Sequence, residues 1–114
     1  NNYRDLGDTK KARKLHEQAL ILKEKYFGKD HFELAFTLDS LGKDYKNLGG
    51  LKKAKELHER SLKIKELYYG IAHQELIETL TALGNTHQSL KNLKQAQLCF
   101  ERALKIRKQH LEPN

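Results

Sequence analysis

Histidine and cysteine are the residue types in this sequence that are best suited to metal binding or nucleophilic chemistry. The 114 residues include six histidines and a single cysteine, Cys99. No Cys-x-x-Cys pair is present, so no spacing matches a structural zinc site. One cysteine also excludes an internal disulfide, and we expect the reducing environment of the cytoplasm.

Four of the histidines form two pairs with the same separation along the chain, His16 with His58 and His31 with His73. A shared metal would need ring nitrogens from two such residues within about 2.1 Å of one ion, whereas packed helices lie roughly 8–10 Å apart. We therefore assign these histidines to packing and loop roles. No motif brings a nucleophile, an acid and a base together, so the sequence predicts no enzyme, no metal and no cofactor.

The 42-residue spacing of these pairs continues along the whole chain and defines an internal repeat. Residues 6–47 and 48–89 are identical at 20 of 42 positions. A leucine and an alanine occur at the same place in all three copies: Leu6, Leu48 and Leu90, and Ala12, Ala54 and Ala96. A fixed period of this kind is typical of repeat proteins, in which each unit stacks on the next.

Each repeat carries two stripes of apolar residues with helical spacing. The residues of the first stripe are separated by four or three positions, which places them on one helix face: Leu34, Leu38, Leu41, Tyr45 and Leu48. The pair Gly49-Gly50 then stops the helix, because glycine tolerates the left-handed backbone. A second stripe begins at Leu51, so each repeat is predicted to be two antiparallel helices joined by a tight turn.

The composition supports a fully helical chain, because proline occurs once and good helix formers are abundant. We predict an all-α fold with helices near residues 8–27, 31–47, 50–69, 73–89 and 92–110, and with residues 1–6 as the end of a further helix. Gly42 and Gly84 fall inside helices, where glycine costs about 1 kcal/mol relative to alanine. We expect close packing against Ala54 and Ala96 to require them.

These residues resemble the tetratricopeptide repeat, whose signature is W-x2-L-G-x2-Y followed by A-x3-F. The sequence contains Leu38-x2-Leu41-Gly42-x2-Tyr45 with Ala54-x3-His58, and Leu80-x2-Leu83-Gly84-x2-His87 with Ala96-x3-Phe100. Leucine replaces the tryptophan, and histidine replaces several aromatic residues. The long period and the junction Gly28-Lys29-Asp30-His31 are similar to repeats of kinesin light chains and of sensors that carry a nucleotide-binding domain.

The resemblance implies a right-handed superhelix of antiparallel helix pairs, in which the first helix of each pair lines a groove. The chain would be one array, with a partial repeat over 1–30 and repeats over 31–72 and 73–114. The implied function is a non-catalytic scaffold that holds a peptide or helix of a protein partner. The alternative is a regulatory or oligomerisation segment of a larger signalling NTPase or motor adaptor, and we expect the chain to be a piece of a longer protein.

The groove contacts should come from the side of each first helix that does not face the buried stripe. The residues predicted to line the groove are Arg4, Asp5, Phe36, Asp39, Lys43, Lys46, Asn47, Glu78, Thr81, Asn85, Gln88 and Ser89. Phe36 is the sharpest candidate, since its repeat mate is Glu78 and an aromatic side chain off the buried stripe suits an anchor. Packing of Phe36 on a neighbouring helix is an equal alternative.

A net charge of +7 and an isoelectric point near 9.5 raise the question of nucleic-acid binding. Most basic residues lie on the second helices, however, interleaved with glutamates such as Glu17, Glu59 and Glu101, which is typical of a solvated face. No cluster of base-stacking aromatic residues accompanies them. We therefore expect a protein partner rather than nucleic acid, and no small-molecule substrate.

No apolar run approaches the roughly 20 residues that span a bilayer, so no membrane association is expected.

The two ends of the chain have different patterns from the interior. Leu98 stands where Lys14 and Glu56 stand in the other copies, and a terminal repeat normally has a polar outer face. We expect self-association through these unfinished ends.

Overall fold

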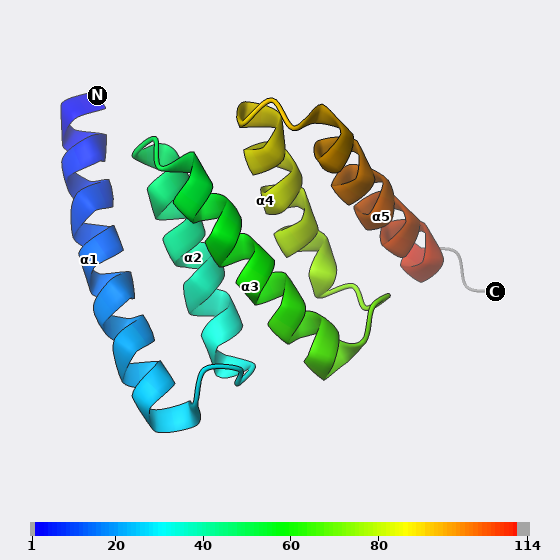
Figure 1. Cartoon of the computed structure of the whole chain (residues 1–114), viewed down its shortest axis with the longest axis horizontal. Helices are drawn as coiled ribbons and strands as arrows, with labels where there is room; N and C mark the ends of the chain where they lie inside the picture. The colour runs from blue at the N-terminus through cyan, green and yellow to red at the C-terminus, as the bar shows by residue number, and fades with distance from the viewer. Residues whose placement is uncertain (1, 112–114) are drawn as a thin grey trace.

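The computed structural model describes the backbone of residues 2–111 and the side chains of residues 7–110. Over these residues it is entirely helical, without a strand, as predicted. Its five helices follow one another as antiparallel neighbours (Figure 1): α1 (Asn2–Phe27), α2 (Glu33–Asn47), α3 (Leu51–Tyr69), α4 (Leu76–Ser89) and α5 (Leu93–Leu111). The helices α2 and α3 form one pair, α4 and α5 form the next, and α1 packs against α2.

The turn inside each helix pair has the same geometry in both copies, although the residues differ. Gly49 has a φ of +88° and follows α2, where the N–H of Gly50 donates to the carbonyl of Tyr45 at 2.7 Å. At the equivalent place after α4, Lys91 adopts a φ of 68°, and the N–H of Asn92 donates to the carbonyl of His87 at 2.8 Å. Lysine therefore accepts a left-handed conformation that glycine adopts freely.

The first helix of each pair begins two or three residues later than predicted, at Glu33 and Leu76. The cause is a turn built by the paired histidines. Nδ1 of His31 accepts a hydrogen bond from the N–H of Glu33 at 3.1 Å, and Nδ1 of His73 accepts one from the N–H of Glu75 at the same distance. These two histidines therefore have the loop role that the sequence suggested.

The predicted break near residue 6 is wrong, because α1 continues without interruption from Asn2 to Phe27. The equivalent turn has two glycines after α2 and none after α4, so glycine alone does not decide where it forms, and the run of helix formers that follows Gly7 and Asp8 continues the helix. Arg4 and Asp5 therefore belong to α1 and not to a separate groove helix, and their side chains lie outside the described part of the chain.

Two apolar clusters form the core, and each joins a helix pair to the helix before it. The first contains Leu34, Leu38 and Leu41 of α2, with Leu57 of α3, and Leu20 of α1 packs against it. The second contains Leu76, Leu80, Ala103 and Ile106, and Leu62 of α3 packs against it. Because Leu20 and Leu62 occupy the same place in successive repeats, both repeats bury the same stripe against the following pair.

The glycines inside α2 and α4 are required by close packing of the partner helix, but the contacting residues are not the predicted alanines. A methyl group on Gly42 would lie 2.7 Å from the ring of His58, and one on Gly84 would lie 2.7 Å from the ring of Phe100. Such distances are shorter than van der Waals contact allows. The aromatic residue of each second helix therefore occupies the space that the glycine leaves open.

Candidate functional site

The first helices α2 and α4 run in the same direction (Figure 1), and hollows open between and beside them. One of them, which we call the central hollow, has a volume of about 630 Å³ and is lined by Lys43, Gln74, Glu75, Ile77, Glu78, Thr81, Ala82, Asn85 and Arg107. A second of about 220 Å³, the basic hollow, shares three of these residues and is lined by Lys43, Lys46, Asn47, His58, Ala82 and Asn85.

The two hollows bring together six of the predicted groove residues. Three come from α2 and three from α4: Lys43, Lys46 and Asn47, and Glu78, Thr81 and Asn85. Each of the two helices thus contributes the side that remains after its apolar stripe is buried. These two hollows and a third one around Phe36, which is described below as the aromatic hollow, form one surface. We call this surface the α2–α4 groove.

One ion pair crosses this groove. Nζ of Lys43 lies 3.6 Å from a carboxylate oxygen of Glu78, with side-chain exposures of 58% and 67%. A pair that is so open to water contributes little to stability. Both charges can therefore be redirected to a bound partner at small cost.

Phe36 is exposed to 73% and does not pack on a neighbouring helix as the alternative interpretation supposed. It lines the aromatic hollow, which has a volume of about 270 Å³ and lies near the starts of α2 and α4. The hollow is lined by Phe32, Glu33, Ala35, Phe36, Asp39, Lys65, Tyr69, Glu75 and Glu78. An exposed phenyl ring in a depression is a suitable contact for an apolar or cationic side chain.

Asp39 is placed differently from the prediction, because its side chain is only 5% exposed. Its carboxylate accepts hydrogen bonds from Nδ1 of His58 at 2.9 Å and from the hydroxyl of Thr79 at 2.6 Å, and Nζ of Lys65 lies 3.2 Å away. Burial by itself raises the pKa of Asp39, but these partners outweigh burial and the pKa is lowered. Asp39 therefore holds helices together and offers no free acceptor to a partner.

Gln88 and Ser89 are exposed at the end of α4. Gln88 lines a different depression, the end hollow, which is largely apolar and has a volume of about 360 Å³. The other residues of the end hollow are Leu93, Ala96, Gln97, Phe100, Glu101 and Leu104. The structure thus separates Gln88 from the α2–α4 groove.

Several lining residues were not predicted from the sequence. Glu33 and Glu75 were missed although they occupy the same place in successive repeats. Arg107 was missed because it comes from α5, a second helix, yet it reaches the central hollow. Its repeat mate Lys65 likewise extends from α3 towards α4, where its Nζ lies 2.8 Å from the hydroxyl of Thr79.

Histidine and cysteine side chains do not gather into a chemical centre in the described part of the chain. No group of three or more His, Cys, Asp or Glu residues there is arranged to hold a metal ion. Cys99 is half-buried, and burial raises the pKa of its thiol, which disfavours the reactive thiolate. His87 is buried, and desolvation lowers its pKa.

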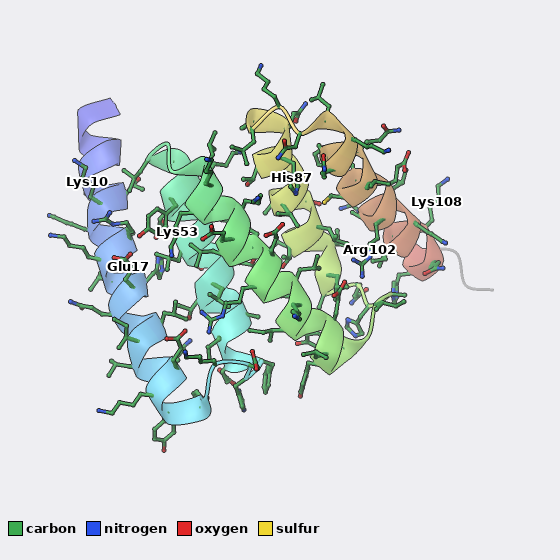
Figure 2. All side chains as sticks on the ribbon, viewed as in Figure 1. Lys10, Glu17, Lys53, His87, Arg102 and Lys108 are labelled. Atoms are coloured by element: carbon green, nitrogen blue, oxygen red, sulfur yellow. The ribbon has the colours of Figure 1, made fainter. Side chains whose placement is uncertain are left out.

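Basic side chains are concentrated on the second helices, as Lys10 of α1, Lys53 of α3 and Lys108 of α5 illustrate (Figure 2). All three are exposed. Among residues 2–111, no helix combines the length and apolar character needed to cross a bilayer. Of the groove helices, α2 carries both signs of charge, whereas α4 has a glutamate and no lysine or arginine.

The two ends of the helical stack expose apolar side chains that are buried at equivalent places inside it. On α1, Leu15 and Leu22 are 65% and 66% exposed, whereas their repeat mates Leu57 and Ile64 are 5% and 2% exposed. On α5, Leu104 is 54% exposed. Both end faces are therefore capable of burying a further apolar surface.

Comparisons with known proteins agree with this architecture. The tetratricopeptide repeat family model matches residues 1–67 and 45–109. The fold matches the crystal structure of nearly identical TPR-like repeats from a Podosopora anserina protein that carries the name kinesin light chain, with a TM-score of 0.85 and 21% sequence identity. The match covers 96% of this chain and 52% of that one, so this chain spans about half of its length. None of the curated proteins compared matches the sequence.

The family match extends over most of the chain, and its two matched segments overlap between residues 45 and 67, where α3 follows α2. The arrangement of helix pairs agrees with it independently, because both turns and both core clusters recur with the 42-residue period. Proteins of this kind generally mediate contacts between proteins. The chain belongs to the tetratricopeptide repeat family.

Proposed function

We propose that the chain is a non-catalytic scaffold that binds a segment of a protein partner in the α2–α4 groove. The observation that supports this proposal is that six side chains from α2 and α4, with donors, acceptors and both charges, line two adjoining hollows. Asn47 and Asn85 each carry an amide that can pair with a peptide backbone. Phe36 supplies an exposed aromatic contact beside them.

An open groove of this kind is suited to holding a chain and not to chemistry. Its hollows are open to water, and a reaction centre normally excludes water and brings a nucleophile close to an acid or base. The buried polar groups beside the groove, such as Asp39 and His58, are already paired with each other. The groove therefore offers recognition without a catalytic group.

The proposal is tested by selecting binders from a library of short random peptides against the folded chain. Affinities of the recovered peptides are then measured by fluorescence polarisation for the wild type and for the variant Phe36→Ala/Asn85→Ala. We expect this variant to lose on the order of tenfold or more in affinity, since truncation of anchor residues has effects of that size.

The matched control is Leu67→Ala/Gln95→Ala, which removes an apolar side chain of almost equal exposure, 74%, and an exposed amide from the second helices. It should bind as the wild type does. Equal binding of both variants, with helicity unchanged by circular dichroism, would refute the α2–α4 groove as the binding surface.

Self-association is a second candidate, and the exposed leucines of the two end faces support it. Leu15 and Leu22 of α1 expose apolar surface that their repeat mates bury, and Leu104 of α5, which lines the end hollow, is more exposed than its partly buried repeat mate Leu62. Light scattering over a range of protein concentrations tests it. A mass that rises with concentration, and falls back to that of the monomer in Leu15→Glu/Leu22→Glu, is expected, and a constant monomer mass would contradict it.

A further inference from the structure

The charged residues of the α2–α4 groove are sorted towards its two ends. Glu33, Glu75 and Glu78 lie at the starts of α2 and α4, where they line the aromatic hollow with Phe36. Lys43 and Lys46 lie towards the end of α2, where they line the basic hollow. A segment lying along the groove would therefore meet negative charge at one end and positive charge at the other.

This sorting has a physical origin in the parallel direction of the two helices. Glu33 and Glu78 lie in the first turns of α2 and α4, and Lys46 lies in the last turn of α2. Acidic residues at helix starts and basic residues at helix ends complement the helix dipole. Because α2 and α4 run in the same direction (Figure 1), their acidic starts lie at the same end of the groove and reinforce each other, whereas the lysines at the other end come from α2 alone.

The acidic end has carboxylates without partners and an aromatic face beside them. Within residues 7–110, no hydrogen bond or ion pair engages the side-chain carboxylates of Glu33 and Glu75. The nearby ammonium group of Lys65 is already occupied by Asp39 and Thr79. Three carboxylates around an exposed phenyl ring form suitable surroundings for a cation, which is attracted both by the charges and by the ring face.

Two other basic residues, Arg107 and Lys43, lie near these glutamates, but neither lines the aromatic hollow. Arg107 lines the central hollow together with Glu75 and Glu78, but it does not line the hollow that contains Phe36. Lys43 contacts Glu78 at 3.6 Å across the groove, and both side chains are mostly exposed. That pair can open when a partner brings its own charges.

We propose that the groove selects a segment of mixed charge, with an arginine or lysine seated on Phe36 between the glutamates and an aspartate or glutamate held by Lys43 and Lys46. This inference rests on the proposed function and specifies the partner. Phe36 and Lys46 are ten residues apart on α2, which corresponds to about 15 Å at 1.5 Å per residue. An extended segment covers that length with about four or five residues, at roughly 3.3 Å each.

The test uses the peptides recovered in the selection described above. Those that lose binding to Phe36→Ala/Asn85→Ala are sequenced and then measured against two charge-neutral variants, Glu33→Gln/Glu75→Gln and Lys43→Gln/Lys46→Gln. We expect basic and acidic residues about four or five positions apart. Replacing the basic residue of the peptide by alanine should weaken binding to the wild type on the order of tenfold, and much less to Glu33→Gln/Glu75→Gln.

The possible outcomes separate the two proposals. Groove-dependent peptides without paired charges, or with affinities unchanged in both glutamine variants, would overturn the mixed-charge inference and leave the groove as the binding surface. If no recovered peptide depends on Phe36 and Asn85, both proposals fail. If Lys43→Gln/Lys46→Gln weakens the binding of peptides that carry the acidic residue, and not of peptides in which it is alanine, both proposals are supported.

Discussion

Oδ1 of Asp39 lies 2.9 Å from Nδ1 of His58, and both side chains are almost completely buried between α2 and α3. The second carboxylate oxygen of Asp39 accepts from the hydroxyl of Thr79 on α4 at 2.6 Å and lies 3.2 Å from Nζ of Lys65. One carboxylate therefore joins three helices from two successive repeats. Buried charges of this kind require all of their partners.

We predict that Asp39→Ala lowers the free energy of unfolding by about 3–5 kcal/mol, because it leaves Lys65 buried without a counter-charge. Urea denaturation at neutral pH measures this loss. The double variant Asp39→Ala/Lys65→Met should recover part of it, since no isolated charge remains. If the double variant is less stable than Asp39→Ala alone, the unpaired charge of Lys65 is not the cause of the destabilisation.

The same carboxylate should make stability sensitive to acid. The pKa of Asp39 in the folded chain is below its ordinary value of 3.8, so the unfolded state takes up a proton first as the pH falls. The contribution of Asp39 is thus fully present above about pH 4 and is lost as the pH falls through its folded pKa. Asp39→Asn should show a smaller decrease in melting temperature over that acid range than the wild type.

The glycines within α2 and α4 provide a second prediction. Alanine is favoured over glycine in helices by about 1 kcal/mol, but overpacking a core costs about 1–3 kcal/mol. We expect Gly42→Ala to be more destabilising than Gly84→Ala. The ring of His58 is fixed by Asp39 and is 1% exposed, whereas Phe100 is only partly buried and lies beside the open end hollow.

Gly7→Ala is the matched control, because a methyl group there meets no atom within 4 Å and the residue lies inside α1. It should stabilise the chain by about 0.5–1 kcal/mol. Chemical denaturation of the three variants gives the order directly. Stabilisation by Gly42→Ala would show that the contact with His58 relaxes without cost.

The helices and their pairing could be predicted because the 42-residue period and the leucine spacing are local properties. The same reasoning failed at Leu6-Gly7, where the sequence match to Leu48-Gly49 suggested a turn. A turn of this kind is stabilised by the two helices that pack on either side of it. Around Gly7 the helix-forming residues continue α1 to Asn2 as one helix instead.

The groove could be predicted only in part, because the sequence reading assumed one buried side for each helix. In the stack, α2 contacts α1, its own partner α3 and the following first helix α4. The contact with α4 buries Asp39, which the helical periodicity had placed on the exposed side of α2. Lys43 and Asn85 are exposed and line the central and basic hollows, and their role in binding a partner stays a prediction.

His87 provides a third prediction, which concerns pH near neutrality. Its ring comes from α4 (Figure 2), is 7% exposed, and accepts a hydrogen bond at Nδ1 from the amide of Asn92 at 3.3 Å. Desolvation lowers its pKa from the ordinary value of 6.5, so the unfolded state binds a proton more readily as the pH falls below that value. Stability should therefore decrease with falling pH below about 6.5, until the folded pKa is reached.

The measurement compares the melting temperatures of the wild type and of His87→Tyr. Tyrosine is chosen because Tyr45 occupies the equivalent position in the preceding repeat. Tyr45 donates a hydrogen bond to Glu17, and Glu59 is the repeat mate of Glu17. The melting temperature of His87→Tyr should fall less than that of the wild type between about pH 7 and pH 5. Parallel curves would show that other histidines cause the dependence.

A last prediction concerns the arginines that connect successive second helices. Nη2 of Arg102 lies 2.7 Å from a carboxylate oxygen of Glu66 and donates to the carbonyl of Ile71 at 2.9 Å. Arg60 makes the same two contacts with Glu24 and the carbonyl of Lys29. The repeated arrangement ties the loop between helix pairs to the helices on both sides of it.

Because both partners of the ion pair are about one third exposed, the Coulombic part is weak, about 0–1 kcal/mol. The planar guanidinium can bind the carboxylate and the carbonyl at once, which an ammonium group on a flexible chain does less well. Arg102→Lys should therefore lose about 0.5–1 kcal/mol by urea denaturation, although the charge is kept, and amide exchange in the loop around Ile71 should accelerate. Arg107→Lys, at an exposed position with no ion pair among residues 7–110, should stay within about 0.5 kcal/mol of the wild type. Equal effects of the two substitutions would mean that charge alone, and not the two N–H groups of Nη2 in the plane of the guanidinium, holds the loop.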